Sequence, residues 1–588
     1  MYTERGTNNM GVTSERNNQI VIELLKYHGI KKIVVSPGAT NVSFVASIQN
    51  DSFFEIFSCV DERSAAYIAC GIAAETGEPV ALSCTGATAS RNYYPGLTEA
   101  YYRHLPILAI TSTMPLERLG HNIPQVIDRR NPVSDIVKLS VHIPLVKDAE
   151  DEWNCIIRAN EAILELKHRI PGPVHMNVET AQSGTFDVET IKYVRPIDRI
   201  TQEDKLPALS GKRIAIFCGS HMVWSQTLTD AVDRFCQKYG AVVIGDHTGN
   251  YKGVYGANAA LVAMQEVEIP ECSEMDVLIH IGDISGAYLK LHPKEVWRVS
   301  PDGRLCDTFK TLRYTFEFDE AAFFEAYSEN GEITESNADY RNMWQNTYQV
   351  LLDAVPDVPF SNIWTARKLS ASLPEHCVLH LGILNSLRSW NFFDIPKSVS
   401  VFCNTGGFGI DGCVSSLMGA ALMAPDKLFF GVVGDLALFY DLNVLGNRHF
   451  PKNIRLLVIN NGHGQEFRNY KHRAAQFGED TDMFIAAAGH NGNKSSELLR
   501  GFATALGIQY YSAMNKPDFE NALVPFVSEK ETDASIILEI FTEHQDETEA
   551  LREMLTLNGK RGTTAKDMVK KAIGERGTQA LKNIFKRK

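Results

Sequence analysis

Residues 428–461 read LFFGVVGDLALFYDLNVLGNRHFPKNIRLLVINN, and this stretch decides the fold. A first apolar run ends at Gly434-Asp435, a helical pattern follows, and a second apolar run ends at Asn460-Asn461. Two short apolar runs separated by a helical pattern predict a β–α–β unit, whose crossover is right-handed in nearly all proteins. Both strands then end at one edge of a parallel sheet, where open α/β sheets bind ligands.

Asp435 and Asn461 are therefore expected to share one crevice. A carboxylate and an amide oxygen suit Mg²⁺, a hard cation that keeps several waters and shares phosphate oxygens. The alternative is purely structural: Asp435 stabilises the start of the following helix, and the paired asparagines form a turn.

Strand-like and helix-like patterns alternate over most of the chain, without short repeats or low-complexity stretches. This alternation predicts an α/β protein with three doubly wound, parallel-sheet domains whose sheets are covered on both faces. Strands are expected at 32–35, 54–60, 80–84, 107–111 and 174–178 in the first block, and at 213–217, 242–244, 277–281 and 296–299 in the second. The expected domains are 1–185, 206–330 and 345–545, followed by a tail at 546–588.

The composition is that of a globular protein, with 44% hydrophobic and 22% charged residues in 588. The apolar runs are too short to span a bilayer, and the polar start of the chain does not resemble a secretory signal. Eleven cysteines without a CxxC pair favour reduced core residues and a cytoplasmic location. A net charge of −13 argues against general nucleic-acid binding.

The C-terminal tail departs from this acidic balance. Residues 551–588 carry eleven Lys or Arg and three acids, and their apolar residues recur at roughly helical spacing. We expect a helix that packs against the protein's own acidic body or a partner subunit. Contact with a membrane surface is the less favoured alternative.

Glu62 stands between a strand-like run and an Ala-rich helical pattern in the segment EIFSCVDERSAAYIACGIAAETG, residues 55–77. Read by itself, the segment allows a structural interpretation, in which Asp61 caps the helix and Glu62 is an exposed charge near its dipole. In the second block, the segment GDISGAYLK, 282–290, follows a strand but lacks the spaced glycines of a dinucleotide site, so we interpret that block as mainly structural.

Several segments together resemble one enzyme family. The Gly-Asp…Asn-Asn pattern is similar to that of thiamine diphosphate (ThDP) enzymes of the decarboxylase and acetolactate synthase type. Within that superfamily the chain most resembles the menaquinone-pathway synthases (MenD), which join a unit derived from 2-oxoglutarate to isochorismate. The similar segments are SPGATNVSFV (36–45), VDERSAAYIACGIA (60–73), CTGATASRNYYPGLTEAY (84–101), NTGGFGIDGCVSS (404–416) and GDLALFYDLN (434–443).

The resemblance implies three ThDP-type domains: pyrimidine-binding, central and diphosphate-binding. It implies that Glu62 activates the cofactor by binding its pyrimidine ring, and that this carboxylate is buried with a raised pKa. Asp435, Asn461 and the carbonyl of His463, where the family usually has Gly, would bind Mg²⁺. The remaining cofactor contacts would come from Gly409, Ile410, Gly434, Leu436 and Ala437.

The resemblance also implies where substrates bind, and here the chain departs from the family. Two family arginines are replaced in Ala39-Thr40-Asn41 and at Thr405, and a third by Trp390, which follows Ser386 and Arg388. Arg388 could partly substitute, but Thr and Trp cannot replace a bidentate Arg–carboxylate contact. Other candidates for catalysis or substrate binding are His121, Gln125, His463, Arg91 and Arg118.

We therefore expect a ThDP- and Mg²⁺-dependent C–C lyase or carboligase that acts on a 2-oxo acid, with a carbonyl compound as a second substrate in the carboligase case. It would be similar to MenD but have a rebuilt substrate pocket. The resemblance implies a homodimer or homotetramer with active sites between subunits. The alternatives are an authentic menaquinone-pathway synthase and a non-catalytic scaffold with the same fold.

Overall fold

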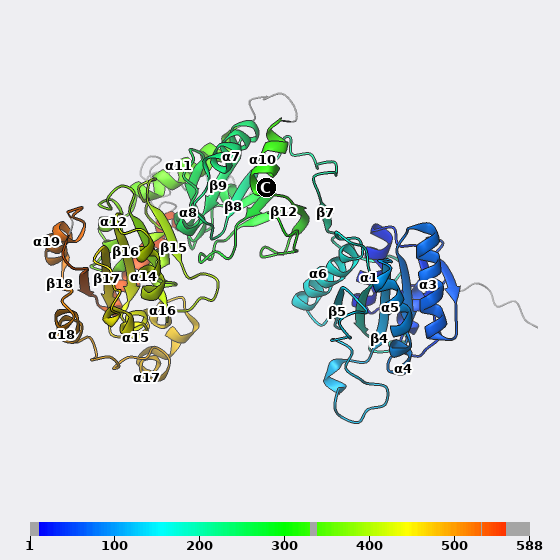
Figure 1. Cartoon of the computed structure of the whole chain (residues 1–588). Coiled ribbons are helices and arrows are strands. Elements are labelled where there is room, and N and C mark those ends of the chain that lie inside the picture. Colours follow the sequence, from blue (N-terminus) through cyan, green and yellow to red (C-terminus); the bar gives the residue numbers. More distant parts are fainter. Residues whose placement is uncertain (1–10, 330–337, 531, 560–588) are drawn as a thin grey trace, which may run out of the picture. The chain divides into compact units, whose positions relative to one another are not determined.

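The computed structural model describes residues 11–329, 338–530 and 532–559 (Figure 1). Most of the basic tail therefore lies outside the described residues, and only its beginning, which includes the end of α20 (His544–Leu555) and residues 556–559, is described. The described chain forms two compact units, the first comprising residues up to Thr201 together with Gly303–Thr315, and the second comprising the rest. No helix among the described residues is long and apolar enough to cross a membrane.

The first unit contains a six-stranded parallel sheet in the order β2-β1-β3-β4-β6-β5. Its strands are β1 (Lys32–Val35), β2 (Glu55–Ser58), β3 (Val80–Cys84), β4 (Ile107–Thr113), β5 (Leu139–Ile143) and β6 (Val174–Glu179). Its helices are α1 (Arg16–Tyr27), α2 (Val42–Ile48), α3 (Glu62–Thr76), α4 (Thr88–Asn92), α5 (Tyr94–Tyr102), the 3₁₀ turn η1 (Leu116–Arg118) and α6 (Ala149–Glu165).

Alternating residues of this sheet fill two separate cores. Ile33 and Val35 of β1 pack in a cluster with α1, α2 and α6, whereas Val34 packs in a cluster with α3 and α5. Because successive side chains of a strand point to opposite faces, helices on both sides bury the whole strand. The first sheet is therefore doubly wound.

The second sheet has seven strands in the order β10-β9-β8-β11-β12-β13-β7. These strands are β7 (Asp198–Ile200), β8 (Ile214–Cys218), β9 (Val242–Gly245), β10 (Gly256–Asn258), β11 (Glu274–Ile281), β12 (His292–Ser300) and β13 (Leu312–Glu317). The accompanying helices are α7 (Gln226–Tyr239), η2 (His247–Gly249), α8 (Ala259–Ala263), α9 (Pro270–Ser273), α10 (Glu320–Glu329) and α11 (Asp339–Asp353).

The third sheet has six parallel strands in the order β15-β14-β16-β17-β19-β18. These are β14 (Val378–Leu381), β15 (Ser400–Cys403), β16 (Phe429–Gly434), β17 (Ile454–Asn460), β18 (Gln509–Ala513) and β19 (Ile536–Phe541). The helices, besides α20, are α12 (Asn362–Ser370), α13 (Asn385–Trp390), α14 (Cys413–Met423), α15 (Asp435–Tyr440), η3 (Leu442–Gly446), α16 (Gln465–Arg468), η4 (Arg473–Asp480), α17 (Thr481–Phe484), α18 (Leu498–Ala505) and α19 (Lys516–Phe526).

The expected α/β fold with parallel sheets is confirmed, and each apolar run expected to form a strand contains one. The expected apolar runs did not include β5, β7, β10 and β13 of the first two sheets, or β14, β15, β18 and β19 of the third. β7 and β10 are only three residues long, and β5 and β7 are the outermost strands of their sheets. Short edge strands bury few side chains, so they carry a weak apolar signal.

Candidate functional site

The carboxyl ends of β16 and β17 bring two of the predicted site residues together. These strands pair in parallel, with Gly434 opposite Ile459, so the segments that follow them start from the same edge of the sheet. Asp435 is the first residue of α15, and its Oδ2 accepts a hydrogen bond from the backbone N–H of Gly462 at 3.1 Å. The Asp435 carboxylate therefore contacts the loop that carries Asn461.

Asp435 is a buried carboxylate with few partners. Its side chain is 6% exposed, and burial raises its pKa to about 7, although backbone N–H groups oppose that shift. A second buried carboxylate, Glu539 of β19, adds to the effect, while its own oxygens accept hydrogen bonds from Asn460 and Tyr510 at 2.6 Å. A buried carboxylate that lacks a cation is costly, so this donor set suits a bound metal ion.

The neighbouring loops leave room beside this carboxylate. A Cβ placed on Gly434 would meet no atom within 4 Å. Asn461 is half-buried, and its Oδ1 lies 3.4 Å from the backbone nitrogen of His463, which donates to it. The His463 ring is turned toward Gln465, with Nε2 2.8 Å from Oε1, and burial lowers the pKa of His463.

The other predicted cofactor contacts lie in two nearby segments. Ile410 packs at the border of the core next to the half-buried Gly409. Leu436 is half-buried and Ala437 is buried in the first turn of α15.

In the first unit, Glu62 is the first residue of α3, and Asp61 is its N-cap, with Oδ1 accepting from the Ser64 N–H at 2.9 Å. The capping role proposed for Asp61 in the structural interpretation is thus correct. Glu62 is half-buried in the single chain and lies 3.4 Å from the Asn92 amide, which donates to it. Asp61 alone supplies the side-chain cap, so the Glu62 carboxylate is not needed for that role.

The substrate candidates of the first unit fall into two groups. Asn41 is 1% exposed, and its amide donates to the Ser36 carbonyl at 3.0 Å, so it serves the turn after β1. The others are exposed: Arg91 donates to the Tyr94 hydroxyl and the Asp128 carbonyl, Arg118 lies against the Met114 sulfur, and His121 and Gln125 lie in the following loop.

The second-unit candidates are more constrained. Ser386 and Thr405 are both 4% exposed. Arg388 forms a two-pronged ion pair with Glu466, with both Nη–Oε distances at 2.9 Å. Trp390 is fully buried, and its carbonyl accepts from His247. A charge at position 390 would therefore enter the core in this chain.

Backbone strain marks the same loops. Ala87, after β3, has φ 52° and ψ −123°, and Leu384, after β14, has φ 67° and ψ −113°. Gln125 and Phe408 also have positive φ, at 66° and 54°. Non-glycine residues in such conformations are strained and cluster at functional sites in proteins. Ala87 and Phe408 lie in the motif segments 84–101 and 404–416, Gln125 is itself a substrate candidate, and Leu384 directly precedes α13, which carries Ser386 and Arg388.

Arg129 was not among the sequence candidates, although it lies in this region. It is 4% exposed, its Nη2 donates to the Ser112 carbonyl at 2.9 Å, and its Nη1 is buried without a hydrogen-bond partner in the described chain. Its sequence context, Asp128-Arg129-Arg130, resembles an ordinary surface charge cluster. Only the fold reveals that the middle residue turns inward.

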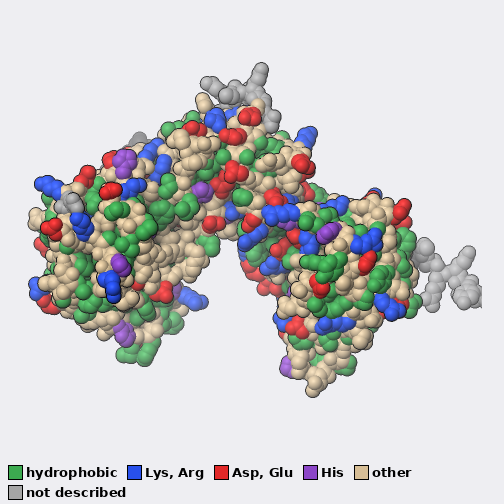
Figure 2. Space-filling model, in the orientation of Figure 1, with side chains coloured by type: hydrophobic (Ala, Val, Ile, Leu, Met, Phe, Trp, Pro, Cys, Tyr) green, Lys and Arg blue, Asp and Glu red, His purple; other side chains and the backbone are tan. Residues whose placement is uncertain are grey.

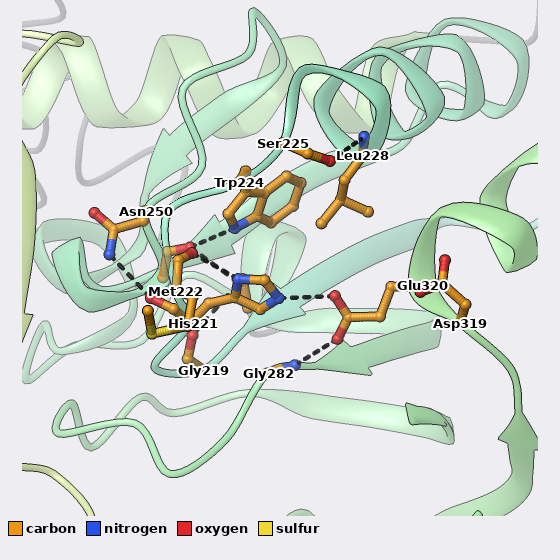
Figure 3. Close-up of polar contacts among 12 residues, drawn as sticks. Gly219, His221, Met222, Trp224, Ser225, Leu228, Asn250, Gly282, Asp319 and Glu320 are labelled. Carbon is orange, nitrogen blue, oxygen red and sulfur yellow. Dashed lines mark hydrogen bonds and ion pairs between the residues drawn. The ribbon is translucent and has the colours of Figure 1, made fainter. Parts of the chain in front are cut away.

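The second sheet closes its own carboxyl edge between β8 and β11 with internal contacts (Figure 3). His221, after β8, places Nε2 2.8 Å from Glu320 of α10, and this carboxylate raises the histidine pKa. The other Glu320 oxygen accepts from the Gly282 N–H at 3.2 Å, and the Trp224 indole donates to the Gly249 carbonyl at 2.8 Å. These groups satisfy one another at the place where open sheets commonly bind ligands.

A cavity of about 420 Å³ opens beside the ends of β9 and β10, lined by Asp246, Lys252 and Lys397 among others. None of the predicted site residues lines it. Figure 2 shows acidic and basic side chains interspersed over the visible face of both units, without a continuous basic stripe on that face.

Comparison with known proteins agrees with the motifs. Residues 16–131 match the family described as "Thiamine pyrophosphate enzyme, N-terminal TPP binding domain". The chain is similar to 2-succinyl-5-enolpyruvyl-6-hydroxy-3-cyclohexene-1-carboxylate synthases. It is 31% identical to those of Phocaeicola vulgatus and Bacteroides fragilis, over 92% of this chain and 98% of each relative. It is 28% identical to the synthase of Desulfotalea psychrophila, over 81% of this chain and 90% of that relative.

Since similarity at this level spans nearly the full length of both proteins, the chain belongs to the thiamine diphosphate-dependent enzyme family of these synthases.

Proposed function

We propose that this enzyme is a ThDP- and Mg²⁺-dependent carboligase acting on a 2-oxo acid, with a substrate pocket that differs from that of its relatives. The observation that carries the proposal is the buried Asp435 carboxylate held against the Asn461 loop by the Gly462 N–H. It supplies a hard oxygen donor next to an amide side chain, with open space at Gly434.

The residues present fit ThDP with Mg²⁺. Asp435, Asn461 and the carbonyl of His463 would hold the metal ion, and the backbone of Gly434, Leu436 and Ala437 would face the diphosphate. Gly409 would lie against the cofactor and Ile410 would support its bent shape. When bound, the cofactor supplies a carbon nucleophile for the keto group of the 2-oxo acid and stabilises the negative charge left by CO₂.

Glu62 would hold the proton that activates the pyrimidine ring. Its position supports this role. Glu62 begins α3, but Asp61 provides the cap of that helix. Within the described chain, the Glu62 carboxylate accepts only one long hydrogen bond, from Asn92. Gln125 would contact the substrate, and His121 and His463 would move or hold protons. Burial lowers the pKa of His463, which favours the neutral ring that a proton acceptor requires.

The changed pocket is supported by what stands at the family's arginine positions. Thr40 is buried, and its hydroxyl is hydrogen-bonded to the Thr85 hydroxyl and the Ser112 carbonyl. Thr405 is buried, and Trp390 belongs to the core. Arg388 is neutralised by Glu466. None of these four positions offers an unpaired cation, so a substrate carboxylate would have to be bound by other residues, for which Arg91 and Arg118 are candidates.

A homodimer or homotetramer is part of the proposal. Helix α3 exposes Tyr67 and Ile68 by 48% and 44% next to Glu62, and Val60 is 79% exposed before it. In the second unit, Met423 at the end of α14 is 81% exposed. Such apolar groups at the surface of a single chain are typical of subunit contacts. Analytical ultracentrifugation of the wild-type protein and the Tyr67→Asp/Ile68→Asp variant tests this part.

The function is tested by measuring CO₂ release from a panel of 2-oxo acids, with ThDP and Mg²⁺, with and without carbonyl acceptors. Release with one acid that depends on both ThDP and Glu62 supports the proposal. If the enzyme binds ThDP but releases no CO₂ from any acid of the panel, it does not decarboxylate these acids. Failure to bind ThDP with Mg²⁺ favours the non-catalytic scaffold, and efficient use of 2-oxoglutarate with isochorismate favours an unaltered menaquinone-pathway synthase.

A further inference from the structure

The first unit contains a buried cation for which the described chain provides no counter-charge. Arg129 is 4% exposed, and no carboxylate among the described residues forms an ion pair with it. The adjacent acid, Asp128, is used by Arg130, with an Oδ2–Nη2 distance of 2.7 Å. Burial, with a smaller contribution from the nearby Arg91 guanidinium, lowers the pKa of Arg129 to about 10. A buried, unpaired charge is costly unless an anion compensates it.

One nitrogen of this guanidinium has a partner and one does not. Nη2 donates to the Ser112 carbonyl at 2.9 Å, whereas Nη1 is buried without an acceptor in the described chain. A charged donor left without an acceptor loses more free energy than a neutral one. An anion oxygen that reached Nη1 would therefore be bound strongly and selectively.

The position of Arg129 connects it to the predicted substrate site. The Ser112 carbonyl, near the end of β4, also accepts a hydrogen bond from Thr40 Oγ1 at 3.2 Å. Thr40 lies in the segment where the family has its substrate-binding arginine. Arg129 thus places a guanidinium at the carbonyl that Thr40 contacts, approaching it from the loop after β4.

Gly86, which follows β3, lies between these groups. A Cβ at this position would lie 3.2 Å from the Gln125 carbonyl oxygen, 3.4 Å from the Ser112 carbonyl oxygen and 4.0 Å from Arg129 Nη1. A side chain at residue 86 would therefore be in van der Waals contact with Nη1 at the carboxyl edge of the first sheet. This edge is where ligands bind in open α/β sheets.

We propose that Arg129 is the buried half of an anion-binding site, with Arg91 as its exposed half, and that it holds a substrate carboxylate that is not lost as CO₂. The inference rests on the proposed function. A guanidinium that stabilises a carboxylate opposes its loss as CO₂, because the ion pair is stronger in the ground state than in the transition state. The bound carboxylate is thus the second one of a dicarboxylic 2-oxo acid or the one on an acceptor.

The test is isothermal titration calorimetry on the full chain carrying Glu62→Gln, loaded with ThDP and Mg²⁺. The probes are 2-oxoglutarate, whose second carboxylate persists, isochorismate, whose carboxylate belongs to an acceptor, and pyruvate, which has only the carboxylate that leaves. Adding Arg129→Gln should weaken binding of 2-oxoglutarate or isochorismate at least about 10-fold while changing pyruvate binding less than about twofold. The probe that is affected identifies the source of the carboxylate.

Arg130→Gln is the matched control, because this neighbour is exposed and paired with Asp128, and it should leave all three titrations unchanged. Arg129→Lys should restore part of the affinity. If Arg129→Gln does not fold, Gly86→Ala provides the test, since its methyl group would obstruct Nη1 and should weaken the same probe.

Three results would overturn the inference. Arg129→Gln, or Gly86→Ala where Arg129→Gln does not fold, could leave every affinity unchanged or could weaken pyruvate binding as much as binding of the other probes. Alternatively, neither 2-oxoglutarate nor isochorismate could bind to the Glu62→Gln parent. Binding rather than turnover is measured, so the result is separate from the proposed function. That function fails instead if the wild-type enzyme binds ThDP but releases no CO₂ from any acid.

Discussion

The Asp435 carboxylate accepts a hydrogen bond from the Gly462 N–H, 27 residues later in the chain, at 3.1 Å. This contact joins the segments that follow two neighbouring strands, so the carboxylate is held against the loop that carries Asn461 as well as against N–H groups at the start of its own helix. Asp435 is also 6% exposed, and the Asn461 loop contains Gly462 at φ 78°, a backbone conformation that glycine adopts readily.

Asp435→Asn should weaken Mg²⁺-dependent ThDP binding at least about 10-fold, because the amide cannot supply the anionic oxygen that the metal requires. ThDP titration followed by intrinsic fluorescence measures the effect, with circular dichroism to check the fold. Asp426→Asn, at an exposed acid in the loop before β16, is the control and should bind ThDP normally. Unchanged binding by Asp435→Asn would remove this residue from the metal site.

Glu62→Gln should reduce turnover by about 100-fold or more, since a carboxamide cannot exchange the proton that a general acid–base group must move. Thermal stability should change little, because Asp61 rather than Glu62 caps α3. The comparison is with Glu75→Gln at the exposed end of the same helix, which should retain activity. If both variants were equally active, the catalytic role of Glu62 would be wrong.

Glu547 of α20 should make stability depend on pH. It is 6% exposed, accepts a hydrogen bond from the Asn362 N–H at 2.9 Å, and has its pKa raised by burial from 4.5 to about 7. Below pH 4.5 Glu547 is protonated in both the folded and the unfolded state, so the free energy of unfolding is at its highest with respect to this group. It then falls as the pH rises to about 7, because only the unfolded state releases the proton freely, and it is constant above that.

Glu547→Gln should remove this loss and stabilise the protein at pH 8 by on the order of 3 kcal/mol relative to its effect at pH 4.5. Thermal or denaturant unfolding at the two pH values measures the difference. Glu549→Gln, at an exposed position of the same helix, should show no such pH dependence. If Glu547→Gln changed the free energy of unfolding by the same amount at both pH values, Glu547 would titrate normally in the folded protein.

Trp390→Ala should cost about 3–5 kcal/mol of unfolding free energy, because it empties a fully buried site in the second unit. Trp390→Arg should be at least as damaging, since it buries an unpaired charge. Chemical denaturation measures both. If Trp390→Arg were as stable as the wild type, this position would be able to present a cation to a substrate, and the pocket would resemble that of the relatives.

The sequence predicted the α/β fold, most strands and the meeting of Asp435 with the Asn461 loop, because these follow from apolar runs and from the handedness of one crossover. The edge strands β5 and β7 were not predicted, since their short, mixed sequences resemble loops. The two-unit division was also not predictable, because it depends on contacts between residues far apart in sequence.

Charged side chains were the least predictable part of the site. Arg388 was a candidate for binding a substrate carboxylate, but it is paired with Glu466, 78 residues later in the chain. Arg129 lies in a charged surface-like sequence but turns inward, toward Ser112. Sequence pattern indicates which residues carry charge, whereas the partner of each charge is set by tertiary packing.

The central claim is a ThDP carboligase whose substrate pocket differs from that of its relatives. The most direct test supplies this enzyme and the Phocaeicola vulgatus synthase with 2-oxoglutarate, isochorismate, ThDP and Mg²⁺, and measures coupled product by mass spectrometry. We predict product from the relative and at least about 100-fold less from this enzyme, since the paired Arg388 and the buried Thr405 and Trp390 cannot replace bidentate arginines. Comparable rates from the two enzymes would contradict the account.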